Sequence, residues 1–310
     1  MQEESIEKRL RIADSEISRI LEGRVVESFD VNDPHWQKIC AEAIGSRPAS
    51  WRRILGRRLK AGGRNGREQL EVRKTYDQHY GATSAVADWL VELDKRSLVA
   101  QWRDKGFVLT PGALRLAHLL YIARAIEVLR PASVLEVGCG NGNMLFSLSA
   151  MFPEVKFSGV ELSAAGVALA VKAQEQGALP ASFAAAFTAP VLDPMAHLRV
   201  SVQVADARML PFADRSIDLV YTRLALEQME QIRPQVIDQI ARVANRAVAL
   251  VEPWRDFNRA DPGRAYIRRM GYFNGEAREL EKNGFSPVLV TDDIPQKVQF
   301  SAGPVIALRR

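Results

Sequence analysis

A glycine-rich turn, VLEVGCGNGN at residues 134–143, is the stretch whose residue types point most directly to ligand binding. It ends an apolar run and contains three alternating glycines, Gly138, Gly140 and Gly142. Glycines after a strand let the backbone approach a nucleotide closely. A triphosphate-binding loop places Lys and Ser or Thr directly after its last glycine. Asn143 and Met144 stand there instead, so the sequence excludes a loop of that kind.

The spacing and the neighbouring charge also argue against a dinucleotide. The dinucleotide fingerprint is G-x-G-x-x-G, whereas the third glycine here comes one residue early. Glu136 stands two residues before Gly138, where its carboxylate would repel a pyrophosphate and tolerate a ligand with positive charge. Glu161, about 20 residues further on, ends the next predicted strand and would offer its carboxylate to ribose hydroxyls.

The elements that must position these residues alternate between strands and helices from Thr110 onward. Apolar runs predict seven strands, at 133–138, 156–162, 199–207, 216–224, 247–253, 286–292 and 298–310. Helical patterns lie between them, at 113–130, 143–152, 164–176, 233–244 and 262–284. This order predicts an α/β fold with a doubly wound, Rossmann-like sheet that is mostly parallel, with an antiparallel hairpin at the C-terminal end. The glycine turn then belongs at the carboxyl edge of the sheet, where ligands bind.

Three blocks of sequence, in the expected order, resemble class I methyltransferases that use S-adenosylmethionine (SAM). VLEVGCGNGN looks like motif I of that family, Glu161 matches its ribose-binding acid, and VADARMLPFADRSIDLVYTRL resembles its third block. The resemblance covers about residues 131–310 and implies that Asp206 takes the adenine amino group while Ala207 lies beside the ring. It implies SAM as the cofactor, with these binding residues: Tyr76, Glu136, Gly138, Gly140, Asn141, Gly142, Glu161, Leu162, Asp206, Ala207 and Thr222.

Methyl transfer needs alignment of the acceptor with the methyl group and, for an oxygen or nitrogen acceptor, removal of a proton. The segment LALEQMEQ, at 224–231, lacks the His that many relatives have there. The catalytic candidates are therefore His79 as a general base, Glu227 and Glu252. Two simpler interpretations stay open: Glu227 as a solvated acid in a first helical turn, and Glu252 as a hydrogen-bond partner of nearby backbone. The candidates for substrate binding are Tyr80, Arg223, Gln228 and Trp254.

The segment KTYDQHYG, at 74–81, comes before the predicted core and carries His79 between two tyrosines. Tyr76 and Tyr80 are four residues apart and would share one helical face. Similar methyltransferases have a Y-D-x-x-Y segment that closes over SAM. The alternative is that these aromatic side chains only attach the first part of the chain to the core.

The LPF-type third block, at residues 210–212, resembles that of small-molecule methyltransferases, and the resemblance implies the expected acceptor class. The sequence has no N-P-P-Y or D-P-P-Y segment, and no Pro-Cys pair for attack on cytosine. The best match is a small-molecule methyltransferase, with an anionic or sugar-like acceptor held by arginines beyond the fifth strand: Arg255, Arg259, Arg264, Arg268 and Arg269. One alternative is an RNA methyltransferase that uses the basic run at 52–74. Another is a non-catalytic SAM-binding partner subunit.

Composition sets the remaining expectations. The chain has 310 residues, a net charge of +5 and 47% hydrophobic residues, as in an ordinary soluble protein. It lacks a signal-like start and a run of about 18 apolar residues, so we expect a cytoplasmic protein without a membrane span. Two cysteines and four scattered histidines predict neither a disulfide nor a metal site. We expect a helical extension or lid at 1–109, the methyltransferase domain at 110–310, and a homodimer through the N-terminal helices.

Overall fold

The computed structural model describes residues 2–45, 68–81, 97–110, 112–175 and 192–310. Most of the basic run at 52–74 lies outside these ranges. In the part of the chain that is described, no helix is long and apolar enough to cross a membrane.

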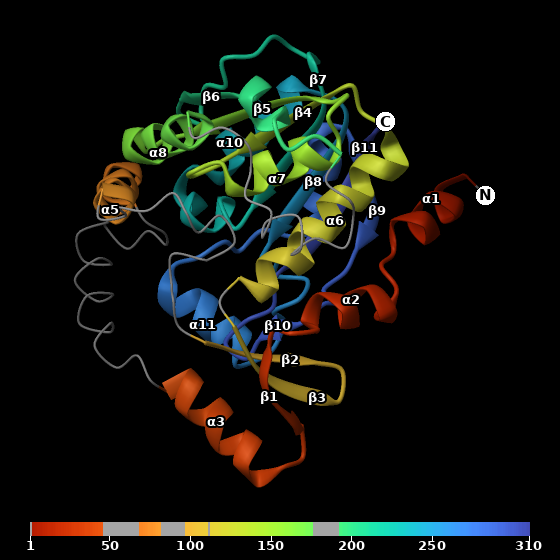
Figure 1. Ribbon diagram of the computed structural model, residues 1–310, viewed down its shortest axis with the longest axis vertical. Coiled ribbons are helices and arrows are strands. Elements are labelled where there is room, and N and C mark those ends of the chain that lie inside the picture. Colours follow the sequence, from red (N-terminus) through yellow and green to blue (C-terminus); the bar gives the residue numbers. More distant parts are fainter. Residues whose placement is uncertain (1, 46–67, 82–96, 111, 176–191) are drawn as a thin grey trace.

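A seven-stranded sheet forms the centre of the molecule, with the strand order β6-β5-β4-β7-β8-β11-β9 (Figure 1). The first five of these strands run parallel, and β11 pairs antiparallel with both β8 and β9. Their bounds are β4 (Ser133–Val137), β5 (Lys156–Glu161), β6 (Ser201–Val204), β7 (Ile217–Arg223), β8 (Ala244–Glu252), β9 (Phe285–Val290) and β11 (Gly303–Arg309). This confirms the predicted doubly wound α/β fold.

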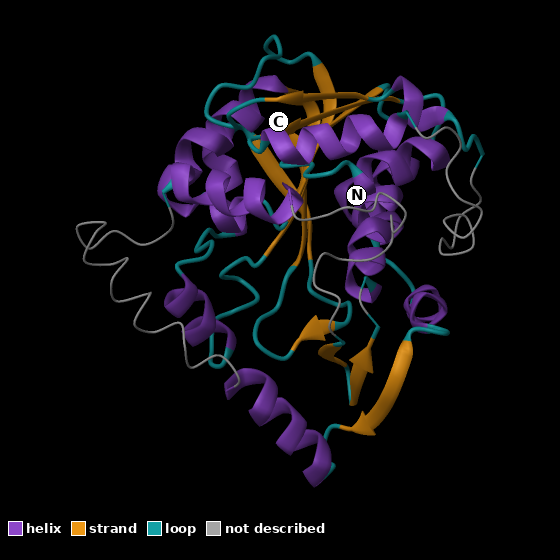
Figure 2. Cartoon of the chain, turned by 60° about the vertical axis from the view of Figure 1, so that its left-hand side comes forward, coloured by secondary structure: helices purple, strands orange, loops and turns teal. Residues whose placement is uncertain are grey.

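Helices cover both faces of the sheet (Figure 2). They are α6 (Ala113–Leu129), α7 (Asn143–Met151), α8 (Ala164–Gln174), α10 (Arg233–Val243) and α11 (Gly263–Met270). The side chains of a strand point to the two faces of the sheet, and each face has its own hydrophobic core. Val134 of β4 packs in one core, and Leu135 and Val137 pack in the other. Most of α6 is apolar and buried, because this helix lies between the sheet and the N-terminal helices.

The sequence predicted a helical extension at 1–109, but the described part of this segment contains strands as well as helices. It contains the helices α1 (Gln2–Leu10), α2 (Asp14–Leu21), α3 (Pro34–Gly45) and α5 (Gln69–Gly81). It also supplies β1 (Val25–Asp30), β2 (Leu98–Trp102) and β3 (Lys105–Leu109), which join β10 (Gln296–Lys297) in a second sheet of order β1-β3-β2-β10. Since β1 is exposed along almost its whole length, its sequence carries no alternation of buried and exposed residues. The second sheet therefore combines strands from both sides of the boundary expected at residue 109.

The helix predicted at 262–284 is much shorter in the structure. Helix α11 ends at Met270, where Gly271 takes a left-handed conformation with φ of 64°. The chain then runs through an irregular stretch to a short 3-10 helix, η5 (Ala277–Asn283). A glycine in this conformation is a common helix end, so the break follows from local chemistry.

Candidate active site

A cavity of about 620 Å³ lies at the carboxyl end of β4, β5 and β7, as the topology requires. Its walls come from the glycine turn, from α5, from the segment after β7, and from single residues of α6 and β10. Most of the predicted site residues line it: Tyr76, His79, Tyr80, Glu136, Gly138, Gly140, Asn141, Glu161, Leu162, Arg223, Glu227 and Gln228. The structure thus brings together residues that lie far apart in the sequence; the hydrogen bond between Gln69 and Gln228, for example, joins residues 159 positions apart.

The glycine turn needs glycine for its backbone shape and for close approach. Gly138 and Gly140 both take positive φ, 81° and 56°. A Cβ atom at Gly138 would lie 2.5 Å from the Cβ of Ala225, and one at Gly140 would collide with the hydroxyl of Tyr80. The turn therefore leaves its backbone open to the cavity while other segments pack directly against it.

Glu161 is the last residue of β5, and its side chain lines the cavity. Its carboxylate accepts hydrogen bonds from the backbone N–H of Gly140 and of Ser163, both at 2.9 Å and each on a different oxygen. A carboxylate has about four lone-pair sites, so acceptor capacity remains for hydroxyl groups. Burial raises the pKa of Glu161, while these backbone hydrogen bonds act in the opposite direction.

Glu136 supplies a second carboxylate to the same cavity. It is buried, and the hydroxyl of Tyr221 donates to its Oε2 at 2.8 Å. Burial raises the pKa of Glu136 to about 8, whereas Tyr221 and the charge of Arg223 lower it. A ligand with positive charge near this group would favour the ionised form. Two carboxylates that line one cavity suit SAM, whose sulfur and amino group are cationic.

Helix α5 covers the glycine turn with the aromatic residues that the sequence singled out. The rings of Tyr76 and Tyr80 stack at 6.0 Å, and His79 meets Tyr80 edge to face at 5.9 Å. Asp77 fixes the helix on the start of α8, because its Oδ1 accepts from the hydroxyl of Ser163 at 2.6 Å. The sequence analysis missed this anchor, although Asp77 lies within the quoted segment.

The segment after β7 forms the opposite wall. Glu227 and Gln228 face the cavity, and the amide of Gln228 donates to Glu227 Oε1 at 2.8 Å. Gln69 of α5 donates to the carbonyl of Gln228 at 3.2 Å, so the two walls are joined directly. This hydrogen bond links α5 to the segment that carries a catalytic candidate.

Basic side chains that the sequence analysis missed lie at this end of the cavity. Arg115 of α6 and Lys297 of β10 line it together with Arg223. The Nε of Arg223 donates to His118 Nδ1 at 3.3 Å. Burial, with the charges of Arg223 and Lys297, holds the pKa of His118 well below its usual value. These residues escaped notice because Arg115 and His118 sit within an apolar helix and β10 is only two residues long.

Glu252 occupies a different place from the one expected for a catalytic group. It is fully buried, does not line the cavity, and accepts from the Thr222 hydroxyl at 2.8 Å. Its two oxygens also accept from three consecutive backbone N–H groups, those of Ala225, Leu226 and Glu227 at 3.1–3.2 Å. Burial and the charge of Glu227 raise the pKa of Glu252 to about 8, against these hydrogen bonds. Glu252 and Thr222 thus hold the segment that carries Glu227, which is the simpler interpretation left open above.

Trp254, which the sequence suggested as a substrate-binding residue, does not line the cavity. Its side chain is fully buried and meets Phe273 edge to face at 4.9 Å, while its indole N–H donates to the carbonyl of Leu250 at 3.1 Å. It belongs to the hydrophobic core. The prediction that it contacts the substrate is therefore wrong. A large aromatic residue directly after a strand is as readily buried as exposed, and the sequence alone does not decide between the two.

The adenine end of the predicted site is arranged differently from the expectation. Asp206 does not line the cavity; its carboxylate forms an ion pair with Arg208 at 2.6 Å and accepts from the Arg208 backbone N–H at 2.9 Å. These contacts lower the pKa of Asp206. Ala207 is buried in the core and is likewise outside the cavity. The side chains of Asp206 and Arg208 are both partly exposed, and adenine contact by Asp206 stays a prediction.

The described residues contain no group of side chains that could hold a metal ion. Cys40 and Cys139 are free thiols. Burial and the charges of Glu136 and Glu161 keep the pKa of Cys139 well above its usual value. The thiol in the glycine turn is therefore protonated and serves as packing.

Residues 135–251 match a family model described as a methyltransferase domain. No curated protein matches the chain. Among solved structures, the chain is similar to the cyclase SpnF, at 19% identity over 72% of this chain and 74% of that one, with a TM-score of 0.48. It is similar to geranyl diphosphate C-methyltransferase from Streptomyces coelicolor at 11% identity, over 77% and 98%, with a TM-score of 0.47. A SAM-dependent methyltransferase from Aquifex aeolicus matches at 16% identity, over 58% and 82%, with a TM-score of 0.41.

Proposed function

We propose that this chain, which carries a class I SAM-dependent methyltransferase domain, methylates a hydroxyl oxygen of a small anionic molecule. The observation that carries the proposal is the joint lining of one cavity by the glycine turn, by His79 and by three cationic side chains. Its volume of about 620 Å³ lies within the range of small-molecule sites.

The cofactor end of the cavity supplies binding and orientation. When bound, SAM supplies a methyl group attached to a positively charged sulfur. Glu136 would balance the positive charge, and Glu161 would accept hydrogen bonds from the ribose hydroxyls. Tyr80 would close the glycine turn from above and exclude water.

The acceptor end supplies the proton acceptor and the positive charge. His79 would take the proton of the attacking hydroxyl, since it lines the cavity from α5. Arg115, Arg223 and Lys297 would hold an anionic acceptor with its hydroxyl toward the methyl group. Glu227 is a second candidate base, because it faces the same space. Glu252 would act through the backbone of residues 225–227, as a positioning residue.

The test is transfer of a labelled methyl group from SAM to the small-molecule fraction of a cell extract, followed by mass spectrometry of the labelled product. We expect label on a small anionic molecule, and labelling about 10²–10⁴ times slower by a His79→Gln variant that still binds SAM. Label found only in RNA would support the alternative of an RNA methyltransferase, and no label at all would support a non-catalytic subunit. The homodimer through the N-terminal helices and the cytoplasmic location stay predictions.

A further inference from the structure

Glu136 of β4 and Tyr221 of β7 lie side by side in the central sheet. The two strands run parallel, and these two residues are partners in the register of the pair. Alternation along each strand turns both side chains to the same face, where Tyr221 packs in the core that contains Val134. The Tyr221 hydroxyl donates to Glu136 Oε2 at 2.8 Å. The register of the sheet therefore fixes this contact.

Tyr221 lies behind Glu136, out of reach of a ligand. Glu136 lines the cavity of the candidate active site, whereas Tyr221 does not line it and is fully buried. Burial and the charge of Glu136 raise the pKa of Tyr221 well above its usual value, so the hydroxyl keeps its proton and stays a donor. Tyr221 can therefore affect a cofactor in the cavity only through the carboxyl group of Glu136.

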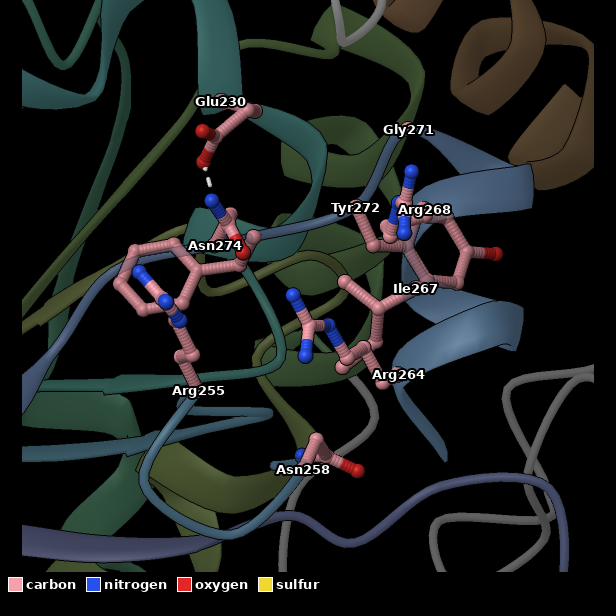
Figure 3. A pocket seen from close by; sticks show the side chains of 10 residues that line it. Glu230, Arg255, Asn258, Arg264, Ile267, Arg268, Gly271, Tyr272 and Asn274 are labelled. Atoms are coloured by element: carbon pink, nitrogen blue, oxygen red, sulfur yellow. Dashed lines mark hydrogen bonds between the residues drawn. The ribbon is translucent and has the colours of Figure 1, made fainter. Parts of the chain in front are cut away.

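A largely buried carboxylate elsewhere, Glu230, shows which partners Glu136 lacks. It lines a second cavity, of about 220 Å³, and accepts from the backbone N–H of Asn274 at 3.0 Å (Figure 3). It also forms an ion pair with Arg233 at 3.3 Å. Within the ranges that the structure describes, Glu136 has no ion pair and no backbone donor, and Tyr221 is its one hydrogen-bond donor. Stabilisation of its ionised form by hydrogen bonding thus depends on a single hydroxyl.

Few of the groups around Glu136 carry charge. Burial, above all, raises the pKa values of Tyr80 and Cys139 well above their usual ranges, so both stay neutral. Arg223 lowers the pKa of Glu136, and Glu161 raises it. Glu161 has a raised pKa of its own, so a variant without the Glu136 carboxyl is needed to separate the two acids. The titratable and charged groups of the described chain that face Glu136 are Tyr80 of α5, Cys139 of the glycine turn, Glu161 of β5, and Tyr221 and Arg223 of β7.

We propose that Tyr221 is a positioning residue for SAM, and that its hydroxyl holds the Glu136 carboxylate ionised and turned toward the positive charge of the bound cofactor. Without this hydroxyl, the carboxyl group keeps its proton over a wider pH range, and a cationic ligand must work against that proton to bind. The inference rests on the charge-balancing role that the proposed function gives to Glu136. It does not depend on the identity of the acceptor.

The test is calorimetric titration of the full chain with SAM. Tyr221→Phe keeps the buried ring and removes only the hydroxyl, so it should fold like wild type. At pH 6 it should bind SAM about tenfold more weakly, because it loses a hydrogen bond to a charged group. At pH 8.5 the difference should narrow to about threefold, because Glu136 then ionises more readily in both proteins. Tyr121→Phe is the matched control: it removes a hydroxyl from another buried tyrosine outside the cavity, and should bind SAM like wild type.

A double-mutant cycle with Glu136→Gln gives a readout that a merely structural role would not move. In the Glu136→Gln background no carboxylate remains to be held ionised. Adding Tyr221→Phe there should change the dissociation constant of SAM by less than about twofold at either pH. A loss through poorer packing would instead have the same size in both backgrounds and at both pH values.

Two results would overturn the proposal. One is a Tyr221→Phe variant that binds SAM like wild type at pH 6, and the other is an equal loss with and without the Glu136 carboxyl. The same titrations separate this inference from the proposed function. If Glu136→Gln keeps the pH dependence of wild type, the charge-balancing role itself fails, and Tyr221 has no carboxylate to position for SAM. If Glu136→Gln loses that dependence while Tyr221→Phe matches wild type, only the role of Tyr221 fails.

Discussion

Replacing Glu136 by Gln should remove most of the pH dependence of SAM binding between pH 6 and pH 7.5. In the free protein, burial raises the pKa of Glu136 to about 8. The carboxyl group is therefore mostly protonated, and neutral, at pH 6. A cationic ligand binds better to the ionised form, so binding is coupled to loss of this proton. The affinity of wild type for SAM should rise with pH as Glu136 ionises.

The size of the effect follows from the pKa. With a value of about 8, roughly 1% of the carboxyl groups are ionised at pH 6 and about 24% at pH 7.5. If the bound cation holds the ionised form throughout, the dissociation constant falls about 25-fold between these two conditions. Stopping at pH 7.5 keeps the amino group of SAM largely protonated.

Calorimetric titration of wild type and of Glu136→Gln with SAM, at both pH values, measures the difference. The variant keeps an oxygen that accepts from Tyr221, so its fold should be preserved. Subtracting its pH dependence removes the contributions of other titrating groups. The reasoning is refuted if wild type shows no rise in affinity, or if the variant shows the same rise.

Three further predictions concern stability and chemistry. Above pH 8, where Glu252 is ionised, Glu252→Gln should lower the free energy of unfolding by about 2–4 kcal/mol in urea, because an amide NH₂ would meet the donors that then face a carboxylate; an unchanged urea midpoint would count against this. Glu136 and Glu252 both have pKa values of about 8, above the ordinary 4.5 of an unfolded chain. The native state thus binds more protons than the unfolded state between about pH 5 and pH 8, and stability should fall as pH rises through that window, less steeply in Glu136→Gln. An equal slope in the two proteins would contradict the assignment. His79→Gln should lower kcat by about 10²–10⁴ for the labelled acceptor with the SAM dissociation constant unchanged, and full activity would exclude His79 as the base.

The central sheet could be predicted because its strands and helices differ in local pattern. Buried parallel strands read as short apolar runs, and the helices between them have their own period. The second sheet could not be predicted in this way. Strand β1 is exposed and pairs with β3, about 80 residues away in the sequence, and β10 has two residues. Such strands form because they pair with distant strands, so the sequence of each strand alone does not predict it.

In the candidate site, too, the residues whose positions depend on local sequence could be predicted, and those whose positions depend on distant contacts could not. Gly138, Gly140, Glu136 and Glu161 are fixed by one turn and the strands beside it, so local spacing placed them in the cavity. Glu252 is the last residue of β8 and Trp254 comes two residues later, and whether such side chains face the cavity or the core depends on how the chain leaves the sheet. The turn at Leu224, with φ of 51°, brings three backbone N–H groups onto Glu252 and takes it out of the cavity wall.

The central claim is that the glycine turn forms the floor of a SAM site, and calorimetry with SAM on wild type and Gly140→Val tests it most directly. Valine at this position would collide with the Tyr80 hydroxyl and strain a backbone with φ of 56°. Circular dichroism must show that the variant is folded. We predict saturable binding of one SAM per chain in wild type and none in the folded variant. No binding by wild type, or equal affinity in both proteins, would contradict the account.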